Sequence, residues 1–458
     1  MYIRFFKRIR VFLLPLTAAA LLTGCGARGK KAPNVVLITI DTLRADHCSI
    51  NGYERETTPF LDSIAAKGSY FENTYPSSSW TAPSMASVCC GLYARQHGVN
   101  HGTVVGRAGK ASVQGQEVLS DRFVTLAEPF RKAGYKTFGI AVNAHLAPEF
   151  GFAQGFDKYQ MLWFGDCPIP NEHAEAWKEE ILAADKYLLW IHYFDPHPIL
   201  FAREPWVSRY NTNAAEIARW SGIDGLPSKR NELKKNPAGL KPLMDIYDSE
   251  INFCDDHVRM LFESFGVGDE DIVVITADHG EEFLEHDWLG HGYNLYNETV
   301  HVPLIIKLPA GEDVIPRVKT PVNNKDSLAT MLDAAGLLKD SGVAGVSLIP
   351  LMKGEEMDYG PVYIEVERYD AHVWRGMREG DWKVLIHQGE KDSWELYNLA
   401  DDPGEKHNLA ESEPQVFASM QKRLLDWLRA NPPFDAAFAQ QELTEEQEEK
   451  LRSVGYLR

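Results

Sequence analysis

Positive charge is scarce in this sequence of 458 residues. Lysine and arginine number 47, against 65 aspartates and glutamates, which gives a formal net charge of −18 at pH 7. Because polyanions bind to basic surfaces, this balance argues against nucleic acid as a partner. Hydrophobic residues nevertheless make up 44% of the chain, enough for one large or two unequal globular domains, so extensive disorder is not expected.

Cysteine is also rare. Disulfide scaffolds and zinc ribbons need closely spaced cysteines, and this sequence contains no CxxC pair. At most two disulfides could form among the five cysteines that follow residue 25. We therefore predict that these five are mainly small core residues: Cys48, Cys89, Cys90, Cys167 and Cys254.

No apolar run that is long enough to span a membrane follows the first 24 residues. Within residues 1–24, four basic residues precede an apolar run over residues 11–22. This run is too short for a comfortable membrane span and predicts a secretory signal peptide over residues 1–24. The following "LTGC" resembles a bacterial lipobox, which implies cleavage before Cys25 and lipidation of its sulfur. A plain signal peptide or an uncleaved anchor is the alternative.

Cleavage after residue 24 would remove four positive charges and change the net charge from −18 to −22. The expected location is the bacterial cell envelope. A lipid anchor on Cys25 would hold the protein to a membrane, facing the periplasm or at the outer membrane. Residues 25–33 would form a linker.

Five apolar segments predict buried strands. Near-continuous apolar runs of this length are typical of a sheet with both faces covered, and amphipathic segments such as residues 57–68 lie between them. We predict an α/β domain over residues 34–355, with a mostly parallel central sheet sandwiched by helices. The predicted strands are residues 34–41, 137–143, 187–195, 271–280 and 302–309.

The character of the sequence changes beyond Pro309, where a short helix over residues 325–338 comes first. Short segments with antiparallel-strand patterning follow one another, and Gly380-Asp381 is placed as a hairpin turn. A helix is expected around residues 414–430, and a charged helix near the end. Residues 356–458 are therefore predicted to form a smaller C-terminal antiparallel-sheet subdomain with a helical tail.

Polar side chains stand at the ends of the predicted strands. They are Asp41, Asn143, His192, Asp278 and His279. The carboxyl ends of parallel strands meet at one edge of a sheet, where ligands bind in open α/β folds. Carboxylates and imidazoles that converge there are what a divalent metal requires.

Several segments together resemble the sulfatase family of the alkaline phosphatase superfamily. The resemblance implies a large α/β domain with a metal at the strand ends, followed by a small antiparallel subdomain. It runs in order from about residue 34 to residue 410, through "NVVLITIDTLRADH", "TAPSMAS", "HYFDPH", "ITADHGEEF", "LYNETVHVPLI" and "ELYNLADDPGE".

One departure from the family concerns its hallmark residue. Sulfatases carry a cysteine or serine in a C/S-x-P-x-R pattern, which is oxidised to formylglycine. Here the pattern reads Thr81, Ala82, Pro83, Ser84 and Met85. The β-carbon of threonine carries a methyl group, so Thr81 cannot become that aldehyde. In phosphoryl-transfer branches of the superfamily a threonine or serine at this place is the metal-bound nucleophile, and the resemblance implies this role for Thr81.

The resemblance also implies the metal ligands, namely Asp41, Asp278 and His279 together with Thr81. Many sulfatases supply a second aspartate directly after the first, but this chain has Thr42. Two carboxylates, one imidazole and one alkoxide favour one Zn²⁺ or Mn²⁺ ion over the Ca²⁺ of standard sulfatases. Ca²⁺ or Mg²⁺ with added waters is the alternative.

The remaining pocket residues are assigned from the same motifs. His197 in "DPH" matches a position that can protonate the leaving group, the alternative being a surface-loop role. Asn143 and His145 are expected to contact the substrate or to make loop hydrogen bonds. His192 is expected at the substrate pocket, where it orients a neighbour. His291 is expected to contact the substrate, with a second metal ion as the alternative.

The predicted function is metal-dependent hydrolysis of a sulfuric or phosphoric ester, or of a phosphonate, by a lipid-anchored envelope enzyme. The substrate would be a sulfated or phosphorylated small molecule, glycan or lipid. One alternative is transfer of a phospho-group to an envelope glycan or lipid, which the missing membrane spans disfavour. The other is an inactive glycan-binding lipoprotein, which Asp41, Asp278 and His279 speak against.

Overall fold

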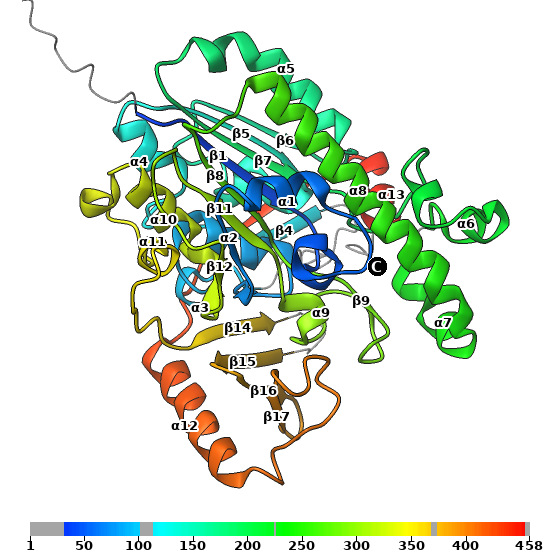
Figure 1. The fold of residues 1–458 in the computed structure, drawn as a ribbon. Helices are drawn as coiled ribbons and strands as arrows, with labels where there is room; N and C mark the ends of the chain where they lie inside the picture. Colours follow the sequence, from blue (N-terminus) through cyan, green and yellow to red (C-terminus); the bar gives the residue numbers. More distant parts are fainter. Residues whose placement is uncertain (1–31, 101–112, 224–225, 368–372, 454–458) are drawn as a thin grey trace, which may run out of the picture. The chain divides into compact units, whose positions relative to one another are not determined.

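An eight-stranded sheet forms the centre of the protein (Figure 1). The computed structural model describes residues 32–100, 113–223, 226–367 and 373–453. The strand order is β12-β2-β11-β8-β1-β7-β5-β6. The strands are β1 (Val35–Ile40), β2 (Ser69–Phe71), β5 (Lys136–Val142), β6 (Lys158–Leu162), β7 (Tyr187–Tyr193), β8 (Ile272–Ala277), β11 (Leu304–Lys307) and β12 (Arg317–Val318).

The five strands at the β8-to-β6 side of this sheet are parallel. β1 pairs with β7 and β8, β7 pairs with β5, and β5 pairs with β6, all in the same direction. β11 runs antiparallel to both β8 and β2. The predicted mostly parallel α/β sheet is therefore confirmed, and the carboxyl ends of β1, β5, β7 and β8 meet at one edge.

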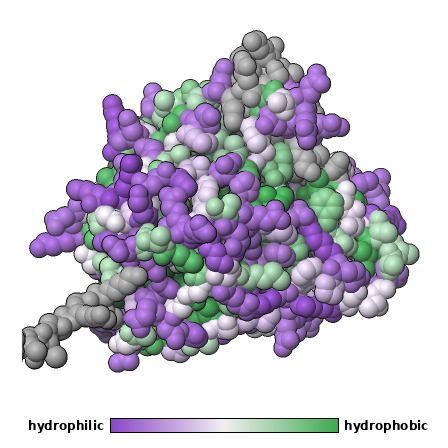
Figure 2. Space-filling view, turned by 90° about the horizontal axis from the view of Figure 1, so that it is seen from above, coloured by the Kyte–Doolittle hydropathy of each residue, from purple (hydrophilic) through white to green (hydrophobic). Residues whose placement is uncertain are grey.

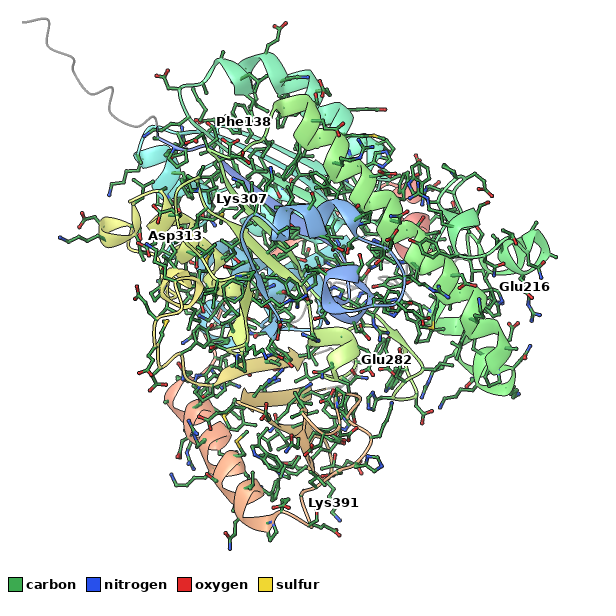
Figure 3. The ribbon with its side chains drawn as sticks, viewed as in Figure 1. Phe138, Glu216, Glu282, Lys307, Asp313 and Lys391 are labelled. Atoms are coloured by element: carbon green, nitrogen blue, oxygen red, sulfur yellow. The ribbon has the colours of Figure 1, made fainter. Side chains whose placement is uncertain are left out.

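Helices cover both faces of the sheet, and β1 shows how its side chains alternate. Val36 and Ile38 pack into one buried cluster, while Val35 and Leu37 pack into another on the opposite face. Phe138, labelled in Figure 3, belongs to the first cluster. The helices on that side are α1 (Pro59–Ala65), α5 (Pro168–Ala183) and α8 (Leu240–Phe265), and those on the other are α2 (Thr81–Cys90), α4 (Ala127–Lys132), α10 (Ser327–Ala334) and α11 (Ile349–Met352).

A four-stranded antiparallel sheet follows, as predicted for the C-terminal part. Side chains on one of its faces pack with Tyr75, Leu295 and Val300 of the α/β part, and those on the other face pack against α12 (Figure 1). Gly380, at φ 55°, turns between β15 and β16. The elements are β14 (Val362–Glu367), β15 (Val373–Glu379), β16 (Trp382–Gln388), β17 (Ser393–Asn398) and α12 (Pro414–Ala430).

The end of the chain returns to the α/β part. β18 pairs antiparallel with β4, over 300 residues earlier in the sequence, so that Ala439 lies opposite Gln116. The small elements are β3 (Thr74–Tyr75), α3 (Ala94–His97), β4 (Val113–Glu117), α6 (Ala214–Trp220), α7 (Arg230–Lys235), β9 (Glu282–Phe283), β10 (Leu289–Gly290), α9 (Asn297–Val300), β13 (Val322–Asn323), β18 (Phe438–Glu442) and α13 (Glu445–Ser453).

The predicted signal peptide and Cys25 lie outside the described residues. Of the helices that the structure describes, none has the length and apolar character needed to cross a membrane. Figure 2 shows one face of the molecule, on which hydrophilic residues predominate and apolar residues are interspersed. The five remaining cysteines are buried and form no disulfide, as the sequence led us to expect.

The end of β8 packs very closely against α9, and a glycine allows this contact. The Gly280 N–H donates to the Thr299 carbonyl at 2.9 Å. A β-carbon at Gly280 would lie 2.1 Å from the carbonyl oxygen of Glu298, closer than any real contact. The loop that follows Asp278 is thus fixed to α9 by backbone contacts that leave no room for a side chain.

We expect Gly280→Ala to lower the free energy of unfolding by about 1–3 kcal/mol, because the backbone of α9 must shift to admit the methyl group. Chemical denaturation measures this. Gly389→Ala is the matched control, since a β-carbon at Gly389 meets no atom within 4 Å. Equal stability of the two variants would contradict the packing described here.

Candidate active site

Three buried side chains meet at the carboxyl ends of β1, β7 and β8. β1 lies between the other two strands, with Thr39 opposite His192 and Ile40 opposite Ala277. Asp41 and Asp278 therefore follow directly on neighbouring strand ends. One ligand atom each of Asp41, His192 and Asp278 lie within 4.8 Å of one another, and the three residues are 0% exposed.

These three side chains carry unsatisfied polar atoms. Among the described residues, Asp41 Oδ1, Asp278 Oδ2 and His192 Nε2 have no hydrogen-bond partner. The His192 Nε2 atom lies 3.5 Å from Asp41 Oδ2. Two buried carboxylates without a compensating charge are costly, and a divalent cation would remove that cost. Carboxylate oxygens and an imidazole nitrogen also suit Zn²⁺ or Mn²⁺, so the residues present fit a metal site.

Electrostatics at the cluster agree with this interpretation. Burial, followed by the nearby charge of Asp41, raises the pKa of Asp278 to about 6. Burial lowers the pKa of His192 to about 4. At neutral pH Asp278 is therefore mainly a carboxylate and His192 a neutral imidazole, which are the protonation states that a metal ion needs in these ligands.

Thr81 and His279 adjoin this cluster. Thr81 Oγ1 lies 3.1 Å from His279 Nε2. The same nitrogen lies 3.6 Å from Asp41 Oδ1 and 3.4 Å from Asp278 Oδ2. His279 Nδ1 donates to the Gly280 carbonyl at 2.9 Å, which leaves Nε2 on the side of Thr81. The four residues predicted as metal ligands thus lie together, and His192 lies with them.

The position of Thr81 follows from the helix that it begins. Thr81 is the first residue of α2, after Trp80 in an extended conformation, and only 1% of it is exposed. The N-terminus of a helix carries partial positive charge, which favours negative charge on the Thr81 oxygen. Ser84, one turn later, donates to the Asp278 carbonyl at 2.6 Å and so joins α2 to the end of β8.

Asn143 and His145 follow β5 at the same edge. Asn143 Nδ2 donates to Asp41 Oδ2 at 2.8 Å, and its Oδ1 accepts from the His145 N–H at 2.9 Å. Asn143 therefore orients the Asp41 carboxylate. Gln116 Nε2 donates to the His145 carbonyl at 2.8 Å, and its Oε1 lies 2.9 Å from His145 Nδ1. Burial and the neighbouring His279 lower the pKa of His145 to about 3.

His197 and His291 lie beside each other next to the cluster. Their ring centroids are 5.0 Å apart, and that of His291 is 4.3 Å from that of His279. The His197 ring also stacks on Phe194 at 4.4 Å, and its Nδ1 donates to the carbonyl of Pro198. Burial lowers the pKa of His197 to about 4. The structure thus brings every predicted pocket residue to one edge of the sheet.

Two residues that contact His145 and His291 were not predicted from the sequence. Gln116 on β4 contacts His145, and Glu281 Oε2 lies 2.7 Å from His291 Nδ1. β4 pairs with a strand at the far end of the chain, so no local pattern reveals Gln116. A hairpin between the segments "EEF" and "WLG", had it been recognised in the sequence, would have predicted that Glu281 lies opposite His291.

Comparison with known proteins finds two family models that match this chain. Residues 33–337 match the sulfatase family model, and residues 284–430 match that of the N-sulphoglucosamine sulphohydrolase C-terminal region. The chain is 24% identical to the uncharacterized sulfatase YidJ of Escherichia coli, covering 88% of this chain and 89% of YidJ. It is 23% identical to the delta 4,5-hexuronate-2-O-sulfatase of Bacteroides thetaiotaomicron, covering 85% and 87%.

Solved structures share the fold. The phosphonate monoester hydrolase of Agrobacterium radiobacter superposes with a TM-score of 0.68 at 21% identity, over 87% of this chain and 95% of the hydrolase. The α/β part and the C-terminal sheet together therefore form an alkaline-phosphatase-like fold. The family match spans more than half of the chain and includes every residue of the cluster. The chain belongs to the sulfatase family and is a hydrolase that acts on ester bonds.

Proposed function

We propose that this protein hydrolyses sulfuric or phosphoric esters, or phosphonates, with Thr81 as the nucleophile and one divalent metal ion at the strand ends. The observation that carries this proposal is the place of the Thr81 oxygen, 3.1 Å from His279 Nε2 and beside the buried carboxylates of Asp41 and Asp278. Thr81 stands two residues before Pro83, where sulfatases carry the residue that becomes formylglycine.

Asp41, Thr81, Asp278 and His279 would hold the metal ion, and His192 lies near enough to join them. When bound, such an ion lowers the pKa of a hydroxyl and neutralises anionic charge on the substrate. We favour Zn²⁺ or Mn²⁺ over Ca²⁺ or Mg²⁺, because two imidazoles are within reach of the carboxylates and Ca²⁺ prefers an all-oxygen set.

Different residues of the pocket would carry out different steps of the reaction. The Thr81 hydroxyl loses its proton to water, its oxygen forms a bond to sulfur or phosphorus, and the bond from that atom to the alcohol oxygen breaks. His197 gives the departing alcohol its proton. Because burial lowers the pKa of His197 to about 4, this proton is taken up only when the anionic substrate is bound beside the ring. Water then gives a proton to the now neutral His197 and attacks the ester on Thr81, which releases sulfate, phosphate or the phosphonate while the Thr81 oxygen takes up a proton.

The substrate would be a sulfated or phosphorylated small molecule, glycan or lipid. Similar proteins support both sulfuric and phosphorus-containing esters as substrates, since one is a hexuronate-2-O-sulfatase and another is a phosphonate monoester hydrolase. A further structural relative, with a TM-score of 0.66, is a complex with its substrate D-glucosamine-2-N,6-O-disulfate. In this proposal Asn143, His145 and His291 contact oxygen atoms of the substrate. Asn143 also orients Asp41.

We also propose that the enzyme works in the bacterial cell envelope. The support is the sequence of residues 1–25, in which a basic and apolar segment ends in a lipobox-like "LTGC". Lipidation of Cys25 would hold the enzyme at a membrane.

A matrix of substrates and metals tests the proposed activity. Residues 26–458 are purified, freed of metal and assayed with an aryl sulfate, a phosphate monoester, a phosphate diester and a phosphonate, each with Zn²⁺, Mn²⁺, Mg²⁺ or Ca²⁺. We expect turnover of at least one ester class, highest with Zn²⁺ or Mn²⁺. The absence of turnover in every combination would refute the proposal and favour a glycan-binding role.

A further inference from the structure

The β9–β10 hairpin places a buried carboxylate against the ring of His291. Phe283 pairs with Leu289 and Glu282 with Gly290, so Glu281 and His291 face each other one position further on. Glu281 Oε2 lies 2.7 Å from His291 Nδ1. Glu281 is 0% exposed and His291 only 9% exposed, so this contact is shielded from water.

The neighbours of the His291 ring are residues of the active site. Its centroid lies 4.3 Å from that of His279, 5.0 Å from that of His197 and 5.7 Å from that of Trp80. With Nδ1 held by Glu281, Nε2 occupies the opposite edge of the ring. A carboxylate that binds one nitrogen of an imidazole fixes both the plane of the ring and the tautomer, as it does in catalytic triads and around metal-bound histidines.

We propose that Glu281 is a positioning residue that acts through His291, holding its ring so that Nε2 meets an oxygen of the sulfuryl or phosphoryl group. This inference rests on the function proposed above. Glu281 itself makes no contact with the substrate in this arrangement.

The adjacent glutamate shows that the role is specific to position 281. Glu282, labelled in Figure 3, accepts hydrogen bonds from the N–H groups of His286 and Trp288 and from the Asn294 amide. It therefore stabilises the hairpin itself. Glu281 and Glu282 are both buried carboxylates on the same hairpin, but only Glu281 contacts a ring of the active site.

A double-mutant cycle tests the proposal. Glu281→Leu, Glu281→Gln, His291→Ala and the double variant Glu281→Leu/His291→Ala are loaded with the metal that gives most activity. We expect Glu281→Leu to lower kcat/KM about 10–100-fold, as loss of a supporting carboxylate does elsewhere. Glu281→Gln, whose carbonyl can still accept from Nδ1, should lose less than about tenfold. The double variant should be no worse than His291→Ala alone, because the two residues act as one unit.

Control measurements separate this role from folding and from the proposed activity. Glu282→Gln should lower Tm, and its effect on kcat/KM should add to that of His291→Ala. The same cycle is measured on the Kd of inorganic phosphate and sulfate, which needs no turnover. An enzyme without activity but with a coupled Kd cycle would refute the proposed function alone. Unchanged kcat/KM and Kd in Glu281→Leu, additive losses in the double variant, or no anion binding by the wild type would overturn the inference.

Discussion

Replacement of Thr81 by alanine should lower kcat by about 10³-fold or more, whereas Thr81→Ser should keep a measurable part of the activity. Alanine lacks the side-chain oxygen that we propose as the nucleophile. Serine retains that oxygen at the N-terminus of α2 and loses only a methyl group. Steady-state assays on the best ester and metal combination measure both variants, and Tm should change little in either.

Ser87→Ala is the matched control for Thr81. Ser87 is also buried in α2, but its hydroxyl contacts the Pro83 carbonyl and His97 rather than the carboxylate cluster. Its loss should affect Tm more than kcat. Mass spectrometry of acid-quenched wild-type enzyme should find the sulfuryl or phosphoryl group on the peptide that contains Thr81. Full activity of Thr81→Ala would disprove its role as the nucleophile.

The fold could be predicted because its strongest signals are local. Apolar runs such as the one that ends at Asp41 are buried on both faces, which requires helices on each side of the sheet. Parallel strands bring their carboxyl ends to one edge, so Asp41 and Asp278 could be expected to meet although 236 residues separate them. The direction of β11 was not predicted, since its apolar run is compatible with either direction.

The finer organisation of the site depends on contacts that periodicity does not reveal. His192 lies inside β7, three residues before Asp195, and only its register with Thr39 on β1 directs it toward Asp41. Gln116 reaches His145 from a strand that is paired with the last part of the chain. Patterns in the sequence identified which residue types converge, whereas the partners that orient them required the tertiary structure.

Without a divalent cation, Asp278→Asn should be more stable than the wild type above pH 6. The pKa of Asp278 in the folded protein is about 6, above its ordinary value of 3.8, because the carboxyl group is buried and lies near the charge of Asp41. The folded state therefore favours the protonated form. The stability associated with that proton is complete below about pH 4 and is lost as the pH rises to about 6. Asparagine mimics the neutral form at every pH, so its advantage should be largest above pH 6 and should disappear toward pH 4.

Addition of Zn²⁺ or Mn²⁺ should reverse the order of stability and make the wild type more stable than Asp278→Asn. A cation that binds only the folded wild type adds about 2.7 kcal/mol at a hundredfold excess over Kd, and the variant lacks one of the carboxylates that would bind it. Thermal unfolding with and without a chelator measures both effects, and kcat of the variant should fall by about 10²-fold or more. Asp271→Asn, at the other end of β8, is the matched control. It should lose stability in both conditions and keep the metal-induced rise in Tm. An equal rise in Asp278→Asn would show that the cation binds elsewhere, because a neutral amide cannot replace the charge of a carboxylate that binds the cation directly.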